Sequence, residues 1–391
     1  MLNLKKWFVR WGIPVVLLAV FVIFTVYINQ VDKVALVNRE GQTFEKGVVT
    51  EILQDNLQPN GTRVGEQRVL VRLTTGVRAG QELETTSASG YLFGAGCTVG
   101  MRVVVLQSVA GDSTITSIYS QDREWVIYAF AAAYLVVLCL VGGKQGIKGA
   151  LGLVFTFFCI LFVYLPLVYR GLSPFWVSVF ICVITTLVTM YLIGGPTRKT
   201  LVATGGTVAG VVIAGISATI FSMATGITGW NVSDIESLLT LASTSGVQVG
   251  GLLFSGLLIS SLGAVMDVAM SIGSAIAEIH AQNPALSRGE LFKAGMHVGR
   301  DMMGTDSNTL ILAFAGGSIS MLVLDYAYSL PYQQIINSNN IGIAIMQGLS
   351  GSFGIVLAVP VTVALAVALY TWKRPNRAET APAEDASRQT R

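Results

Sequence analysis

Long apolar runs separated by short polar segments dominate the chain after Trp125, and one further apolar run precedes residue 32. A helix needs roughly 20 apolar residues to cross about 30 Å of hydrocarbon. Eight runs approach this length, which predicts an α-helical polytopic membrane protein with about eight transmembrane helices. The predicted spans are Trp11 to Ile28, Trp125 to Val141, Gly149 to Val168, Pro174 to Ile193, Leu201 to Met223, Val247 to Ser271, Ser307 to Leu324 and Ile341 to Trp372.

The segment from Asp32 to Glu124 shows a different pattern, in which apolar and polar residues alternate over short stretches. Such alternation is typical of β-strands, and Asn60-Gly61 is a favoured tight-turn pair. The pattern predicts a small extracytoplasmic β-barrel of the oligonucleotide-binding or SH3-like kind, inserted between the first and second helices. The predicted strands are Gly47 to Leu53, Arg68 to Leu73, Gln81 to Thr85, Met101 to Gln107 and Ser113 to Tyr119.

Composition agrees with this division of the chain. Apolar residues make up 52% of the sequence and charged residues only 12%, about half of the share in soluble domains. This excludes a cytosolic enzyme, a collagen and a disordered protein. We therefore expect four parts: a cytoplasmic N-terminus with the first anchor (residues 1–31), the β domain (32–124), the membrane domain (125–372) and a flexible cytoplasmic tail (373–391).

The distribution of Lys and Arg predicts the orientation, because cytoplasmic loops are enriched in them. With the N-terminus inside, fifteen lie in inner segments and only Arg170 lies in a short outer loop. Both termini are then cytoplasmic, in a bacterial inner membrane. The first run could also be a cleavable signal peptide, but no small-x-small site follows it, and an uncleaved anchor is preferred. The inner residues are Lys5, Lys6, Arg10, Lys144, Lys148, Arg198, Lys199, Arg288, Lys293, Arg300, Lys373, Arg374, Arg377, Arg388 and Arg391.

Several kinds of chemistry find no support in the sequence. It has no phosphate-binding glycine loop, no CxxC pair and only two His, so we expect no enzyme activity, no cofactor and no metal. The β domain has nine Lys and Arg against eleven Asp and Glu and no run of aromatic residues, so nucleic acid is not expected. The expected partners are the lipid bilayer and either a second copy or an envelope protein.

Charged residues within spans are costly and usually functional, and Asp267 is the clearest case. Helical spacing places it on one polar face. That face indicates a cation or proton site, or the inner mouth of a pathway. Alternatively, the sixth span ends near Asp267 and the carboxylate lies at the membrane surface; the sequence leaves both open. The face comprises Asp267, Ser271, Ser274 and Glu278.

The inner segment from Ser271 to Asp306 contains a second polar group. Asn283-Pro284 predicts a turn, and Ser287 with Glu290 predicts a capping box that opens a helix at the membrane surface. Hydroxyl and amide residues from Gly304 to Thr309 then lead into the seventh span. They could bind an anion at that helix start, but ordinary N-capping is the favoured role.

Several blocks in this region resemble the bacterial YibE/F-like multi-pass membrane proteins: Gly263 to Ile272, Asn283-Pro284, Gly299 to Thr305 and Asn308 to Phe314. The resemblance covers the membrane domain from about Trp125 onwards and implies a transport role. The residues that it singles out are Asp267, Asn283, Arg300, Asp301, Gly304, Thr305 and Asn308.

The leading hypothesis is a permease or exporter of a small solute or ion, with its pathway between the glycine-rich fifth to eighth spans. Asp267 would be the charge in the pathway, and Arg300 with Asp301 a cytoplasmic gate. The alternative is a non-catalytic envelope scaffold whose β domain binds a partner. An intramembrane hydrolase ranks third, because neither His lies in a span.

Overall fold

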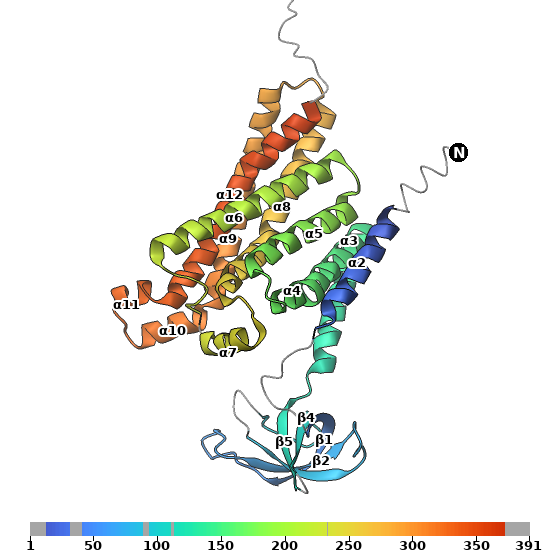
Figure 1. Cartoon of the computed structure of the whole chain (residues 1–391), viewed down its shortest axis with the longest axis vertical. Helices are drawn as coiled ribbons and strands as arrows, with labels where there is room; N and C mark the ends of the chain where they lie inside the picture. The colour runs from blue at the N-terminus through green and yellow to red at the C-terminus, as the bar shows by residue number, and fades with distance from the viewer. Residues whose placement is uncertain (1–12, 32–40, 89–93, 111–112, 233, 372–391) are drawn as a thin grey trace, which may run out of the picture. The chain divides into compact units, whose positions relative to one another are not determined.

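The structure, a computed structural model, describes residues 13–31, 41–88, 94–110, 113–232 and 234–371 (Figure 1). The chain forms two compact units: unit 1 is Met1–Val34 with Gly142–Arg391, and unit 2 is Ala35–Val141. The predicted tail, residues 373–391, lies outside the described residues. The elements are α2 (Ile13–Asn29), β1 (Gln42–Gln54), β2 (Gln67–Leu73), β3 (Glu82–Ser87), β4 (Arg102–Ala110), β5 (Ser113–Gln121), α3 (Glu124–Cys159), η2 (Ile160–Tyr164), α4 (Leu165–Tyr169), α5 (Pro174–Gly194), α6 (Arg198–Thr225), α7 (Ile235–Ser245), η3 (Val249–Gly251), α8 (Leu252–Gln282), α9 (Arg288–Gly317), α10 (Ile319–Ala327), α11 (Tyr332–Ile336) and α12 (Asn339–Thr371).

Unit 2 contains a closed five-stranded β-barrel, which confirms the barrel that the alternating pattern predicts. The strands are hydrogen-bonded in the order β1, β2, β3, β5, β4, and β4 closes against β1. The neighbours are antiparallel, except for the parallel contact of β3 with β5. The predicted turn is present between β1 and β2, where Gly61 has a φ of 83° and donates its N–H to the Gln58 carbonyl over 2.9 Å.

The barrel core follows the alternation along β2, whose Val69, Val71 and Leu73 are buried between exposed or half-buried neighbours. Gln67 is buried in the same row, and its amide binds both backbone groups of Cys97. Its Nε2 donates to the Cys97 carbonyl over 3.0 Å, and its Oε1 accepts the Cys97 N–H over 2.8 Å. This one side chain therefore fixes the segment before β4 to the barrel.

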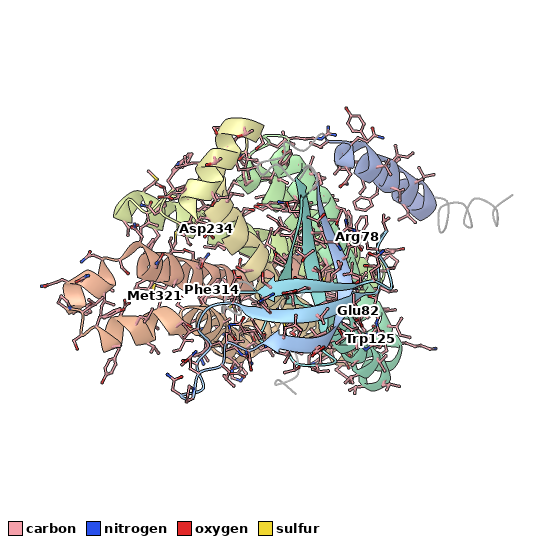
Figure 2. The ribbon with its side chains drawn as sticks, turned by 90° about the horizontal axis from the view of Figure 1, so that it is seen from below. Arg78, Glu82, Trp125, Asp234, Phe314 and Met321 are labelled. Carbon is pink, nitrogen blue, oxygen red and sulfur yellow. The ribbon has the colours of Figure 1, made fainter. Side chains whose placement is uncertain are left out.

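Unit 1 is a helical bundle around α12, which packs against α6, α8 and α9 (Figure 1). Its apolar side chains form three buried clusters. One lies among α6, α8, α9 and α12, the second among α5, α6, α8 and α12, and the third joins α2 to the stretch from α3 through α5. The helices α7, α10 and α11 lie at the end of the bundle where α12 begins; Asp234 before α7 and Met321 on α10 are labelled in Figure 2.

The count of eight predicted spans is not reached. The described residues contain five helices that are long and apolar enough to cross a membrane, or six if the bent pair α9 and α10 forms one span. Two predicted spans, Trp125 to Val141 and Gly149 to Val168, fall within one continuous stretch, Glu124–Tyr169. Gly143 is non-helical there, with a φ of 52°, which glycine adopts at little cost. The first predicted span is described from Ile13, as the 17-residue α2.

Arg170, the single basic residue of the predicted outer loops, binds the C-terminal end of α2. Its guanidinium donates to the backbone carbonyls of Ile28, Tyr27 and Gln30 over 2.8 to 3.2 Å. The last carbonyls of a helix have no partner within the helix, so Arg170 satisfies them. The end of α2 is thereby fixed to the loop that follows α4.

Candidate functional site

Two carboxylates lie near the middle of neighbouring helices in unit 1. Asp267 is 15 residues from each end of α8, and Asp306 lies on α9, 18 residues after Arg288. Asp267 is exposed and Asp306 is half-buried in the isolated chain. They lie close enough for their charges to repel each other when both are ionised.

The helix α9 corrects the predicted course of the chain through this region. The capping box at Ser287 and Glu290 is confirmed, with both of its hydrogen bonds present. However, the helix does not stop before Gly304 and continues without interruption to Gly317. Residues from Gly304 to Thr309 are therefore in a helix interior, and the predictions that they cap a new helix or bind an anion at its N-terminus are wrong.

Glycines set the depth at which α9 packs against α8 and α12. A side chain at Gly299 would collide with Val359 of α12, and one at Gly351 of α12 would lie 2.5 Å from Leu310 of α9 and 3.3 Å from Ser261 of α8. Close packing at these two levels brackets Asp306, which lies between Gly299 and Leu310. It is therefore held at the level of Asp267, which lies beyond Ser261 on the antiparallel α8.

Hydroxyl groups accompany the two carboxylates. Ser352 of α12 donates its hydroxyl to the Ser307 carbonyl over 3.3 Å. The Ser307 hydroxyl is buried and has no hydrogen-bond partner within the described ranges. Buried polar groups are normally paired, so the unpaired hydroxyl of the residue that follows Asp306 marks a place where a water molecule or an ion can be bound.

The four predicted residues of the α8 face lie on one helix, as the spacing requires. Asp267 and Glu278 are exposed, and Ser271 and Ser274 are half-buried. Ser274 donates its hydroxyl to the Met270 carbonyl within the helix, and Glu278 accepts a hydrogen bond from Gln282. Only Asp267 of this set lies beside a second acid.

The remaining predicted residues occupy the end of α8 and the exposed side of α9. Asn283 ends α8 and accepts the N–H of Ala285 over 3.1 Å, which is a turn-forming role. The four side chains on α9 are exposed, and none of them forms a hydrogen bond or an ion pair with Asp267 within the described part of the chain. They are Arg300, Asp301, Thr305 and Asn308.

Asp306, Ser307 and Ser352 are the residues that the sequence reasoning did not place in the site. A signal for Asp306 was present: it follows Gly299 by seven residues and precedes Leu310 by four, which is the spacing of one helix face. That face becomes visible only if residues 288 to 317 form one helix. Ser352 carries no such signal, because serine is common among the small residues of membrane helices.

In the described part of the chain, no group of three or more His, Cys, Asp and Glu side chains lies close enough together to hold a metal ion. The four cysteines are free.

Fold and site together define a multi-pass helical membrane protein that carries a β-barrel near its N-terminus. The YibE/F-like protein family matches residues 130–372, which is more than half of the 391 residues, and the chain belongs to this family. The predicted resemblance is thus confirmed. No curated protein and no solved structure matches the chain. Asp267 and Asp306 lie within the matched range, and the β-barrel lies outside it.

Proposed function

We propose that this protein is a permease or exporter that moves a small solute or an ion past the carboxylates of Asp267 and Asp306. The observation that supports this most is the pairing of two acids at mid-length on adjacent membrane-length helices. The ion pairs within the described residues all lie in unit 2, in the β-barrel and at the start of α3, so none of them involves either acid. Such acids usually line water-filled pathways.

The position of Asp267 on α8 supports a location at membrane depth. At 1.5 Å per residue, the 15 residues on each side correspond to roughly 22 Å of helix in both directions. If such a helix crosses about 30 Å of hydrocarbon, its centre lies within the hydrocarbon unless the helix is displaced along its axis by several turns. This favours the pathway over the surface location that the sequence left open.

The chemistry of the pair favours coupling to a cation or a proton. Two nearby carboxylates cannot both be ionised without mutual repulsion, and a proton or a bound cation relieves it. The unpaired Ser307 hydroxyl adds an oxygen ligand at the same level. Arg300 and Asp301, six and five residues from Asp306 towards the start of α9, are then the proposed gate residues at the end that the charge distribution predicts to be cytoplasmic.

A cysteine-accessibility experiment tests the pathway without knowledge of the substrate. Asp267→Cys, Gly263→Cys and Ser271→Cys are reconstituted in vesicles and treated with a membrane-impermeant maleimide, and mass spectrometry reads each site. The matched control is Val212→Cys, which is similarly exposed at the middle of α6 and is expected to face lipid. We expect labelling at the three α8 sites and none at Val212.

The outcome separates the pathway from its alternatives. Labelling that stops at Asp267 and is absent at Gly263 would place the acid in the headgroup layer. Absence of labelling at both would show that this face meets lipid or protein and would refute the pathway. Where proton or cation flux is measurable, Asp267→Asn and Asp306→Asn should each reduce it, and the exposed Asp234→Asn should not.

The β-barrel favours a second candidate function, an envelope scaffold. Phe44 and Tyr119 form an exposed edge-to-face pair on the barrel, with ring centroids 5.2 Å apart. Exposed aromatic side chains are common in protein interfaces. Deletion of residues 33–122 distinguishes the two functions: transport that survives the deletion excludes the scaffold as the main role, whereas loss of partner capture with an unlabelled α8 face supports it.

A further inference from the structure

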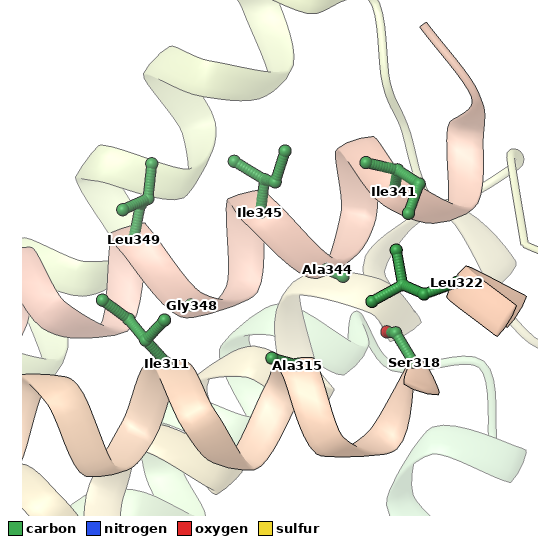
Figure 3. A pocket seen from close by; sticks show the side chains of 9 residues that line it. All are labelled: Ile311, Ala315, Ser318, Leu322, Ile341, Ala344, Ile345, Gly348 and Leu349. Atoms are coloured by element: carbon green, nitrogen blue, oxygen red, sulfur yellow. The ribbon is translucent and has the colours of Figure 1, made fainter. Parts of the chain in front are cut away.

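Two cavities adjoin each other at the end of unit 1 where α12 begins. The first, of about 420 Å³, is almost entirely apolar and lies between α9, α10 and α12 (Figure 3). The second, of about 450 Å³, is polar and lies between the loop before α7, α10, α11 and the start of α12. Both are distinct from the carboxylate pair of Asp267 and Asp306.

A break in the helix after α9 produces the apolar cavity. The axes of α9 and α10 differ by 58°, and Ser318 lies at the break. Ala344 and Gly348 of α12 face Ala315 and Ile311 of α9 across the gap (Figure 3). A Cβ added at Gly348 would still be 3.7 Å from Cγ1 of Ile311. Small residues on α12 therefore leave a groove where larger ones would fill it.

The polar cavity has one charged residue in its lining, Asp325. Its carboxylate is half-buried and forms no ion pair within the described part of the chain. Amide and hydroxyl side chains also line this cavity. They are Asn231, Gln334, Ser338, Asn339 and Asn340. A half-buried carboxylate among neutral acceptors suits a positively charged amine, which donates up to three hydrogen bonds.

Consecutive residues connect the two cavities on both of the helices that they share. Met321 lines the polar cavity and Leu322 the apolar groove, and Asn340 lines the polar cavity and Ile341 the groove. Adjacent Cα atoms are about 3.8 Å apart, so an ammonium group beside Asp325 and a hydrocarbon chain in the groove can belong to one molecule.

We propose that these cavities form one binding site for an amine-headed lipid, with its ammonium at Asp325 and an acyl chain in the groove of Ile311, Leu322 and Ile345. Leu322 and Ile311 are more than a third exposed at the groove, so an acyl chain enters from the side without unfolding any element. The unpaired negative charge of Asp325 selects this headgroup over an anionic one.

Native mass spectrometry of the full chain in detergent tests the proposal with lysophosphatidylethanolamine as the probe. Lysophosphatidylglycerol has an uncharged glycerol in place of the ammonium and is therefore anionic overall, and ethanolamine lacks the acyl chain. We expect the amine lipid to bind on the order of ten-fold more tightly than either, since a charge-assisted hydrogen bond and an apolar contact are each lost. If the two lipids bind equally, the proposed selectivity for the amine headgroup is wrong. If ethanolamine binds as tightly as the amine lipid, the proposed role of the acyl chain is wrong.

Variants locate the site. Asp325→Asn should reduce binding of the amine lipid to the level of the glycerol lipid, and the exposed Glu236→Gln should leave it unchanged. Gly348→Leu should reduce binding of both lipids, whereas Gly316→Leu, at a position with open space around it, should not. Unchanged binding in both Asp325→Asn and Gly348→Leu would refute the site. The comparison of lipids on the wild-type protein decides the question if a variant fails to fold.

Discussion

A close contact between membrane helices predicts the effect of a single methyl group. Gly210 of α6 lies against α8 and α12, and a Cβ added there would be 2.5 Å from Cγ1 of Val265, 2.9 Å from Cβ of Ala358 and 3.0 Å from the Gly354 carbonyl. Carbon atoms in contact prefer about 3.5 to 4.0 Å. The Gly210→Ala substitution therefore requires a helix to move, because a backbone carbonyl cannot rotate away and a valine side chain in a helix has one strongly preferred rotamer.

The size of the effect follows from two opposing contributions. Overpacking a close-packed site typically costs about 1–3 kcal/mol. Replacing a helix-interior glycine with alanine contributes up to about 1 kcal/mol of stabilisation. Gly256 of α8 has open space where its Cβ would be, so Gly256→Ala should show only the second contribution. Both variants share the second contribution, so we expect them to differ in free energy of unfolding by the overpacking cost of about 1–3 kcal/mol, with Gly210→Ala the less stable.

Thermal labelling of a buried thiol provides the assay. Cys182 of α5 is 2% exposed in the cluster formed with α6, α8 and α12. Its reaction with a maleimide in detergent, read by mass spectrometry over a temperature series, reports opening of that cluster. Gly210→Ala should lower the midpoint by on the order of 5 °C relative to Gly256→Ala. Equal midpoints would show that α6 and α12 do not approach each other as closely as the structure has them.

Two further predictions concern the barrel. Gln67→Ala leaves the N–H and carbonyl of Cys97 without their partners, at about 1–3 kcal/mol for each group. Cys97 is fully buried, which also raises the pKa of its thiol, so its labelling requires opening. The labelling rate should rise by on the order of 100-fold in Gln67→Ala, whereas the exposed Gln54→Ala should not change it. The pKa of Asp55 is lowered from 3.8, because hydrogen bonds from Arg63 and backbone N–H groups outweigh the larger single effect of desolvation. Its folded pKa is depressed, so the stabilisation is present above pH 3.8 and is lost as the pH falls through the lowered value. Pepsin cleavage of the loop before β2 should thus be slower in the wild type than in Asp55→Asn at higher pH, with the difference disappearing at lower pH; a difference that does not depend on pH would contradict this.

The barrel could be predicted from the sequence to a large extent, because its strands obey a local rule. Burial alternates along β2 as the apolar and polar residues do, and all five predicted strands overlap observed ones. Closure of the barrel could not be predicted in the same way. It depends on the contact of β3 with β5 at Thr86 and Ser117, which lie far apart in the chain and carry no local signal.

The helix α9 shows why the site was predicted only in part. Thr305, Ser307 and Asn308 have side chains that compete with the backbone for hydrogen bonds, so they favour helix ends in isolation. In the folded chain, the packing of Gly299 and Leu310 against α12 keeps this stretch helical. A tertiary contact thus overrides a local preference, and Asp306 moves from a predicted loop into a helix interior.

Because α9 is continuous, Asp306 lies within a helix and not in a loop, and this changes the free-energy cost of its carboxylate. A carboxylate in an aqueous loop is solvated at no cost, and its presence there implies nothing about function. On a helix that crosses a membrane, an acid near the centre costs about 2.5–3.5 kcal/mol on insertion scales, so that Asp267 and Asp306 together would require about 5–7 kcal/mol of compensation. Neither acid forms an ion pair with Arg300 or any other basic side chain within the described residues. A proton, water or a bound cation would supply this compensation, and the proposed transport pathway would provide all three.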